Sequence, residues 1–338
     1  MRIRLIDCTL RDGGNLNNWF FSDEDVHKII RNLDQGGVDL IEVGYRGGSG
    51  SNKAKRVGKP AHCSQDFLEQ LPTVKQASLA VMVVPSACSI EDLNDLDNNL
   101  VPWVRVAVYP HNIETALPYV DYLKTKGFQV CMNLMAASYV SNQEIKSIAK
   151  KAEAVGADVF YIADSFGALT PDDVRERVCD MVESVSCPIG FHGHNNLGLA
   201  FANVLEAIKS GASFIDTSLC GMARGAGNLP TEQFVSVMNS WNRFEMKYEL
   251  EPILQVAEYV LHSILQSPMK ISTPEIVCGL SNLHYYYYDL VVAKSKEKNL
   301  NSLEVCKMLG KSFPHRVDIT YVDEVINQLL EVKDRREV

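Results

Sequence analysis

Short runs of apolar residues alternate with longer amphipathic stretches through the first two thirds of the chain. Because most of these runs are almost continuously apolar, they are typical of strands buried on both faces of a parallel sheet. We predict eight strands, at residues 3–10, 38–45, 78–85, 101–110, 129–138, 158–167, 187–195 and 213–222. Between them apolar residues recur at helical spacing, and the clearest helices are predicted at 23–35, 141–155, 171–185 and 199–210.

This order of elements predicts an α/β fold, a (β/α)8 TIM barrel in which eight parallel strands close on themselves. Glycines after several predicted helices, such as Gly36-Gly37 and Gly127, would supply the left-handed residue before the next strand. A doubly wound open sheet is the structural alternative. We favour the barrel because the residues with distinctive chemistry follow the first and seventh strands, which a closed barrel brings near each other.

The strand pattern ends after about residue 245, and only helical periodicity follows. We therefore predict a TIM-barrel domain at residues 1–240 and a C-terminal helical appendage at residues 245–338. No glycine- or proline-rich linker separates them, so the appendage is expected to pack on the barrel. Its helices are predicted at 251–267, 274–298, 300–310 and 318–332.

The chain has 338 residues, of which 46% are hydrophobic, so it can bury a large core. A net charge of -9 and a pI of about 5.4 argue against nucleic acid or an anionic membrane as a partner. No signal-peptide pattern or membrane-spanning apolar stretch is found, so we expect a cytoplasmic enzyme. Nine cysteines without a CxxC motif fit reduced thiols in that compartment.

Two histidines lie one residue apart in the seventh predicted strand, CPIGFHGHN. Because successive side chains of a strand alternate between its faces, His192 and His194 point the same way, and paired imidazoles suit a divalent cation. Asp12, after the first strand, adds a carboxylate and completes a candidate metal site. Asn228 in GAGNLPTE either caps the next helix or makes a weak or water-mediated metal contact. For a single histidine, burial in the core would be the simpler explanation.

Several other polar residues fall at predicted strand ends, which line the active site of a barrel. Arg11 places a permanent cation beside the metal site. Glu42 lies inside an apolar strand, where an unpaired charge would cost several kcal/mol, so Arg11 is its expected partner. That pair is either purely structural or holds the arginine in place. Arg46, Ser138 and Ser165 are candidates for substrate binding, although Ser165 also fits an ordinary turn.

Four motifs in order, LRDG, IEVG, HxHN and GAGN, resemble those of a family of metal-dependent TIM barrels. That family includes 4-hydroxy-2-oxovalerate aldolases, 3-hydroxy-3-methylglutaryl-CoA lyases and isopropylmalate synthases. The stretch from His192 to Glu232 and the helical tail are most similar to the aldolases. The resemblance implies that Asp12, His192 and His194 hold Mn²⁺ or Mg²⁺ as the cofactor. It also implies cleavage of a 4-hydroxy-2-oxo acid to an aldehyde and pyruvate enolate, with Arg11 stabilising the enolate.

One residue departs from the aldolase pattern. Asn15 stands where those enzymes have a histidine that is taken to be the general base, and an amide cannot accept a proton near neutral pH. A positioned base contributes about 10²–10⁴-fold to such a reaction. His284 or Tyr285, in a segment where the family has an active-site tyrosine, could replace it. Alternatively, the aromatic run at 284–288 only packs a helix against the barrel.

The alternatives from the same family are a Claisen-type synthase and a CoA-ester lyase, but the lyase's cysteine loop is replaced by residues 222–225, MARG. A different class, a non-catalytic protein that binds 2-oxo acids, would follow if Asn15 has removed turnover. The resemblance also implies that the helical tail pairs with an aldehyde dehydrogenase or forms a homodimer.

Overall fold

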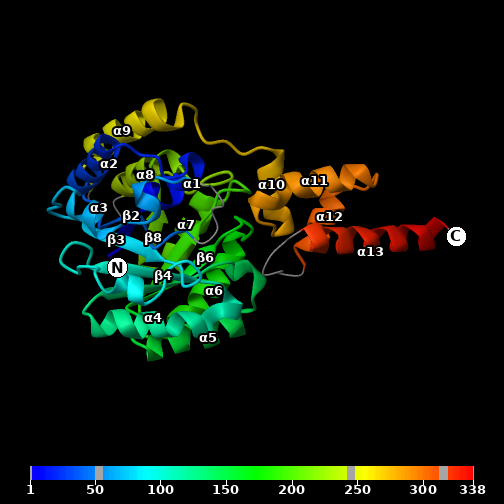
Figure 1. The fold of residues 1–338 in the computed structure, drawn as a ribbon, viewed down its shortest axis with the longest axis horizontal. Coiled ribbons are helices and arrows are strands. Elements are labelled where there is room, and N and C mark those ends of the chain that lie inside the picture. The colour runs from blue at the N-terminus through cyan, green and yellow to red at the C-terminus, as the bar shows by residue number, and fades with distance from the viewer. Residues whose placement is uncertain (1, 50–55, 242–247, 312–318, 338) are drawn as a thin grey trace.

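The computed structural model describes residues 2–49, 56–241, 248–311 and 319–337. Eight parallel strands form a closed barrel in sequence order, and the last strand pairs with the first (Figure 1). They are β1 (Arg4–Asp7), β2 (Leu40–Arg46), β3 (Ser78–Val83), β4 (Trp103–Val108), β5 (Gln129–Leu134), β6 (Val159–Asp164), β7 (Ile189–Gly193) and β8 (Phe214–Thr217). The predicted barrel and all eight strands are confirmed, although most strands are shorter than the predicted runs.

Helices surround the barrel as expected, and local capping explains where they begin. Ser22, Ser141 and Thr170 each form a capping box, in which side chain and backbone satisfy each other's free hydrogen-bonding groups. One connection differs, because only a short 3-10 turn at Glu91–Leu93 lies between β3 and β4. The helices up to the end of the barrel are α1 (Gly14–Asn17), α2 (Asp23–Gln35), α3 (Gln65–Glu69), α4 (Ile113–Thr125), α5 (Asn142–Ala154), α6 (Pro171–Ser184), α7 (Ala200–Lys209) and α8 (Thr231–Trp241).

Strand β2 contains a bulge that changes which side chains face the barrel interior. Glu42 pairs with Ala80 and Tyr45 with Met82, so three steps along β2 match two along β3. The extra residue reverses the alternation of faces, and Tyr45 packs inside the barrel with Met82. Gly44 makes the bulge feasible, because at φ +152° a Cβ would lie 2.0 Å from the carbonyl oxygen of Pro60.

The C-terminal helices form two groups. Helix α9 (Leu250–Tyr259) packs against α2 and α8, and its side chains Ile253 and Val256 belong to the barrel core. The barrel core therefore continues past residue 245, where we expected the helical region to begin. A π-helical turn (Val260–Leu265) follows. The remaining helices extend away from the barrel (Figure 1): α10 (Thr273–Ser281), α11 (Tyr288–Glu297), α12 (Ser302–Leu309) and α13 (Ile319–Glu337).

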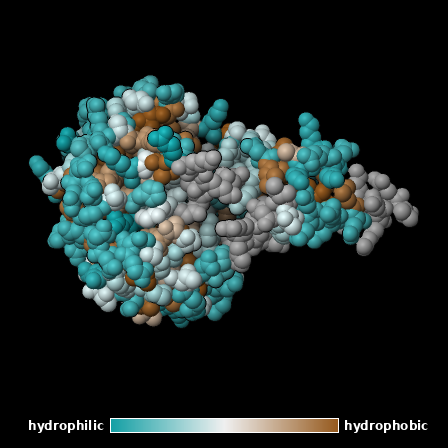
Figure 2. Space-filling model, in the orientation of Figure 1, coloured by the Kyte–Doolittle hydropathy of each residue, from teal (hydrophilic) through white to brown (hydrophobic). Residues whose placement is uncertain are grey.

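These last helices share a second hydrophobic core, which includes Leu283, Val291 and Leu309. In Figure 2 hydrophobic residues also reach the surface between them, whereas the visible face of the barrel is mostly hydrophilic. The helix predicted at 274–298 is broken, because Asn282 adopts a left-handed conformation (φ +55°) after α10. Within the described residues, no helix combines the length and the apolar character needed to cross a membrane.

Candidate metal centre

The segment after β1 places two adjacent candidate site residues, Arg11 and Asp12, in a π-helical turn, Thr9–Gly13. Such turns carry one more residue than an α-helical turn and are frequent at functional sites. Here the turn begins where the sequence predicted continued strand. Tight packing fixes it, since Trp19 donates a hydrogen bond from Nε1 to the carbonyl oxygen of Arg11 at 2.8 Å, and a Cβ on Gly14 would lie 2.0 Å from the Trp19 ring.

Asp12, His192 and His194 converge at the carboxyl end of the barrel. Asp12 Oδ2 lies 3.6 Å from His192 Nε2 and 3.7 Å from His194 Nε2, and the two nitrogens are 3.4 Å apart. All three side chains are buried. A point equidistant from these three atoms is roughly 2.1 Å from each, which matches the length of metal–nitrogen and metal–oxygen bonds. The donor set therefore fits a divalent ion.

Neighbouring side chains orient the candidate ligands. His192 Nδ1 lies 2.9 Å from Asp216 Oδ2, which directs Nε2 towards the centre, as is usual for metal-bound histidines. Asn228 Nδ2 donates to Asp12 Oδ2 at 2.9 Å, while its amide oxygen is buried without a hydrogen-bond partner. The structure thus brings Asn228 to the candidate site, in direct contact with Asp12.

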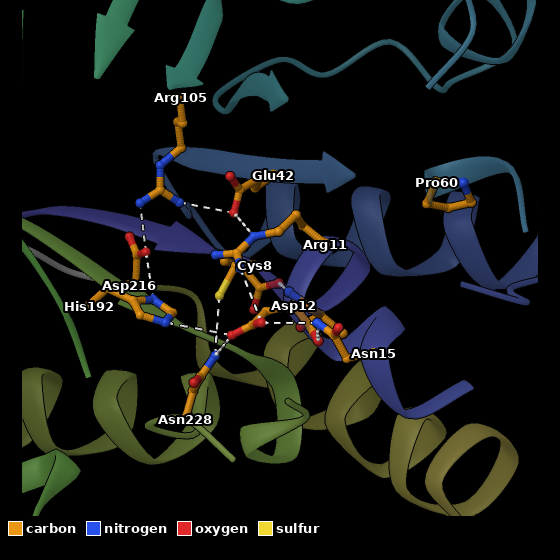
Figure 3. Close-up of polar contacts among 12 residues, drawn as sticks. Cys8, Arg11, Asp12, Asn15, Glu42, Pro60, Arg105, His192, Asp216 and Asn228 are labelled. Atoms are coloured by element: carbon orange, nitrogen blue, oxygen red, sulfur yellow. Dashed lines mark hydrogen bonds and ion pairs between the residues drawn. The ribbon is translucent and has the colours of Figure 1, made fainter. Parts of the chain in front are cut away.

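A buried chain of charges connects the arginine of the site to one of its histidines (Figure 3). Arg11 donates from Nε to Glu42 Oε2 at 2.7 Å, which is the pairing that the sequence predicted. Arg105 donates to the same Glu42 oxygen at 3.0 Å and to Asp216 Oδ2 at 2.7 Å. Since Asp216 also holds His192, Arg105 links both halves of the site across the barrel interior.

Arg46 lies away from these residues. Its guanidinium donates to the carbonyl oxygens of Cys63 (2.7 Å) and Asp92 (3.0 Å) and pairs with Asp95. The β2 bulge explains this placement, because regular alternation from Glu42 would have turned Arg46 inward, whereas the extra residue turns Tyr45 inward instead. The structure does not bring Arg46 to the candidate metal site.

The two serines make different contacts. Ser138 donates its hydroxyl proton to Asn282 Oδ1 at 2.6 Å, so it holds the chain just after α10. Ser165 Oγ accepts a hydrogen bond from the Ala136 backbone N–H at 2.9 Å. The Ser165 hydroxyl therefore keeps its own proton for another acceptor.

Three residues were considered for proton transfer, and each has different surroundings: Asn15, His284 and Tyr285. Asn15 donates from Nδ2 to the carbonyl oxygen of Asp12 at 2.9 Å and approaches its Oδ1 at 3.3 Å, so it supports this candidate ligand. His284 packs edge-on against Phe166, with ring centroids 6.2 Å apart. Burial and the nearby charge of Arg224 lower the pKa of His284 to about 3, so its imidazole is neutral at pH 7. Tyr285 is 40% exposed.

Three charged residues of the site were missed by the sequence analysis. Arg105 and Asp216 lie inside apolar strands, as Glu42 does, and the same signal would have found them. Arg224, in the loop after β8, lies with Nη1 3.7 Å from Asp12 Oδ1. No local pattern distinguishes it, because the loop conformation alone directs it to the site.

The fold and the converging ligands define a class, a (β/α)8 barrel with a candidate divalent-metal centre at the carboxyl ends of its strands. The family model HMGL-like matches residues 2–260. A 4-hydroxy-2-oxovalerate aldolase from Bacillus thuringiensis is 31% identical over 310 residues, covering 91% of this chain and 90% of the relative. A protein of the same name from Carboxydothermus hydrogenoformans is 34% identical over 284 residues, 84% of each chain. The chain belongs to the HMGL-like family.

Solved structures agree with this assignment. The N-terminal domain of an aldolase candidate from Bacteroides vulgatus has a TM-score of 0.78 and 29% identity, and the match covers 88% of this chain and 100% of that domain. The HMG-CoA lyase from Brucella melitensis has a TM-score of 0.64 and 18% identity over 77% of this chain and 98% of the lyase. The second similarity supports the fold alone.

Proposed function

We propose that this protein is a divalent-metal-dependent aldolase that cleaves, or forms, the carbon–carbon bond of a 4-hydroxy-2-oxo acid. Cleavage of that bond would yield pyruvate enolate and an aldehyde. The observation that carries the proposal is the convergence of Asp12, His192 and His194 beside a buried arginine, Arg11. The relatives named 4-hydroxy-2-oxovalerate aldolase, which match most of the chain, support the same reaction class.

The proposed metal ligands are Asp12, His192 and His194, with Asn228 as a weaker or water-mediated fourth contact. Two imidazole nitrogens and one carboxylate suit Mn²⁺ better than Mg²⁺, which prefers oxygen ligands, so Mn²⁺ is the proposed ion. When bound, it would supply Lewis-acid polarisation of the substrate's ketone.

Arg11 is the proposed stabiliser of negative charge on the enolate oxygen. Its Nε is held by Glu42 and its Nη1 lies 3.1 Å from Asp12 Oδ1, so the guanidinium is fixed before substrate binds. A preorganised donor in a site that excludes water lowers the barrier by several kcal/mol. Glu42 therefore acts by positioning Arg11.

His284 is the proposed base for the 4-hydroxyl proton, with Tyr285 as the second candidate. His284 is neutral at pH 7 and enters the mouth of the barrel from the tail, whereas the Asn15 amide already donates to Asp12. Burial is the main cause of the low pKa of His284, and an anionic substrate near Arg224 would offset the second cause, the charge of that arginine. Ser165 is proposed to donate its hydroxyl proton to the substrate carboxylate, while Ser138 positions the tail.

The location and assembly of the protein are also proposals. We place it in the cytoplasm, and we assign the helical tail as the surface for an aldehyde dehydrogenase partner or for a second copy of the chain. Chromatography coupled to light scattering, with and without residues 268–338, would separate a tail-dependent dimer from a monomer.

Exchange of the pyruvate methyl protons tests the proposed chemistry, because enolate formation requires their loss. The Mn²⁺-loaded protein in D₂O should lose the methyl proton signal in NMR spectra, and EDTA should stop the exchange. Asp12→Asn should lower both Mn²⁺ affinity and exchange at least 100-fold, while Asp172→Asn on the exposed surface of α6 should change neither. Absence of exchange, together with no cleavage of any 4-hydroxy-2-oxo acid tested, would contradict the aldolase proposal.

Asn15 favours a second candidate, a non-catalytic protein that binds 2-oxo acids. In that case calorimetry would detect pyruvate binding to the Mn²⁺-loaded protein while the methyl protons stay unexchanged. His284→Gln separates the two candidates further, since loss of the base for the 4-hydroxyl proton should slow cleavage of a 4-hydroxy-2-oxo acid about 10²–10⁴-fold with little loss of binding.

A further inference from the structure

Arg224 is an incompletely paired cation at the candidate site. Its Nη1 lies 3.7 Å from Asp12 Oδ1, the longest ion pair of an arginine or lysine among the described residues. Its Nη2 donates to the carbonyl oxygen of Ser165 at 3.3 Å. By contrast, Arg11 and Arg105 have carboxylate oxygens at 2.7 Å. Arg224 therefore retains donors for a further anion.

The position of Arg224 is central to the mouth of the barrel. Its two contacts join the turn after β1 to the loop after β6. Its charge also acts on Tyr45 of β2, on Tyr109 after β4 and on His284 of the tail. The side chain is 27% exposed, whereas that of Arg11 is 6% exposed. An anion entering the mouth would meet Arg224 on its way to the metal ligands.

The balance of charge in the site indicates a role for Arg224. Arg11 and Arg105 are balanced by Glu42 and Asp216 within the buried chain of charges. A divalent ion, the Asp12 carboxylate and Arg224 would then leave two positive charges. The enolate of a 2-oxo acid carries two negative charges, one on the carboxylate and one on the enolate oxygen. A buried site favours such neutrality, because an uncompensated charge is costly there.

We propose that Arg224 binds the carboxylate of the 2-oxo acid, together with the hydroxyl group of Ser165. This inference rests on the proposed function. The planar guanidinium can donate two parallel hydrogen bonds to a carboxylate, and Ser165 Oγ, which already accepts from Ala136, has its proton free to add a third. The enolate oxygen is then left to Arg11 and the divalent ion, so the two charges of the substrate meet different cations.

Oxalate, which resembles pyruvate enolate in shape and charge, tests this division without requiring turnover. Three variants are compared with the wild type: Arg224→Met, Arg224→Lys and, as a matched control, Arg175→Met on exposed α6. Electron paramagnetic resonance should show Mn²⁺ affinities within about threefold of each other. Calorimetry on the Mn²⁺-loaded proteins should show oxalate binding weakened about 10–100-fold in Arg224→Met, as expected for lost hydrogen bonds to a charged group. Arg224→Lys should lie between, and Arg175→Met should match the wild type.

Kinetics of pyruvate proton exchange provide a second measurement. Arg224→Met should raise KM for pyruvate by about the same factor, with a smaller change in kcat, because the carboxylate is bound in ground and transition states alike. The proposal is wrong if oxalate affinity in Arg224→Met equals that of Arg175→Met, or if the whole loss is in Mn²⁺ affinity. If the wild type binds oxalate but exchanges no protons, the proposed function fails while the oxalate comparison still decides the role of Arg224.

Discussion

Asp12 has two carboxylate oxygens with different surroundings. Oδ2 faces His192 and His194, whereas Oδ1 faces Arg11 and Arg224. Burial alone would raise the pKa of this carboxyl, but Arg11 and the other nearby positive charges hold it well below its usual range. The candidate ligand is therefore ionised throughout the physiological pH range. At this scale one residue connects the two histidines of the candidate metal centre to the two arginines beside it.

Asp7, at the end of β1, provides a prediction about pH and stability. Burial raises its pKa to about 6, despite hydrogen bonds from Thr231 and Thr9. The folded state thus holds this proton more tightly than the unfolded state. The stability it contributes is complete below the unfolded pKa and is lost as the pH rises through 6. From pH 8 to pH 5 the unfolding free energy of the wild type should rise by about 1–2 kcal/mol relative to Asp7→Asn.

Urea denaturation of both proteins at several pH values measures this difference. The exposed variant Asp172→Asn serves as the control, and it should follow the wild type at each pH. A constant difference between the wild type and Asp7→Asn across this range would show that Asp7 does not titrate as described.

The secondary-structure elements determine which residues the sequence could assign to the site. Asp12, His192 and His194 were predictable, because the order of strands and the alternation of faces bring them together. The position of Arg46 away from the site was not predictable, because the bulge at Gly44 depends on contact with Pro60, a residue 16 positions further along. The π-helical turn after β1 was missed for a similar reason, since packing by Trp19 replaces the last residues of the predicted strand with a turn.

Arg105 shows how strands depend on one another inside the barrel. It is fully buried and connects Glu42 of β2 to Asp216 of β8. Arg105→Met would leave both carboxylates without this cation and should lower the unfolding free energy by about 3–5 kcal/mol. Chemical denaturation measures the change, with Arg175→Met as the control. A loss under 1 kcal/mol would mean that Arg11 and His192 suffice to balance the two acids.

Asn282 connects the tail to the barrel. Its side chain accepts a hydrogen bond from Ser138, and its carbonyl oxygen accepts one from the Tyr139 hydroxyl. Alanine is disfavoured in the left-handed conformation and lacks the local hydrogen bonding available to asparagine. Asn282→Ala should therefore lower the stability of the folded state by about 1–2 kcal/mol. Asn282→Gly keeps the conformation and loses only the side-chain bond.

Hydrogen–deuterium exchange of residues 283–311 should therefore accelerate more in Asn282→Ala than in Asn282→Gly, while the barrel strands stay unchanged. The reverse order of the two variants would contradict the proposed importance of the left-handed residue.

At the scale of the whole molecule, the described residues form a large hydrophobic core in the barrel and a separate core among the C-terminal helices. The barrel core closes with α9 and Val260, whereas the second core begins at Leu283. The candidate metal ligands all come from the barrel, and His284 comes from the segment beside the second core. The sequence correctly predicted a barrel followed by helices. It did not reveal that α9 covers the barrel, because helical periodicity alone does not say which surface an apolar face contacts.

Removal of residues 268–338 should separate metal binding from proton transfer. The shortened protein should fold, with the circular dichroism of a TIM barrel, and should bind Mn²⁺ as the full chain does. Cleavage of a 4-hydroxy-2-oxo acid should fall at least 100-fold, because the proposed base for the 4-hydroxyl proton is absent. Full activity of the shortened protein would assign the base to the barrel instead, and loss of Mn²⁺ binding would show that the tail supports the ligands.

The near-complete burial of Asp12, His192 and His194 has a practical consequence for anyone preparing the protein. Their side chains are 0%, 8% and 1% exposed, so an ion held among them has little direct access to bulk solvent. Its escape requires the surrounding segments to open, and such openings are rare in a packed core. The ion acquired during biosynthesis should therefore leave slowly, so EDTA will need a long incubation to remove it, and the metal content of a sample will report the growth medium as much as the preference of the protein.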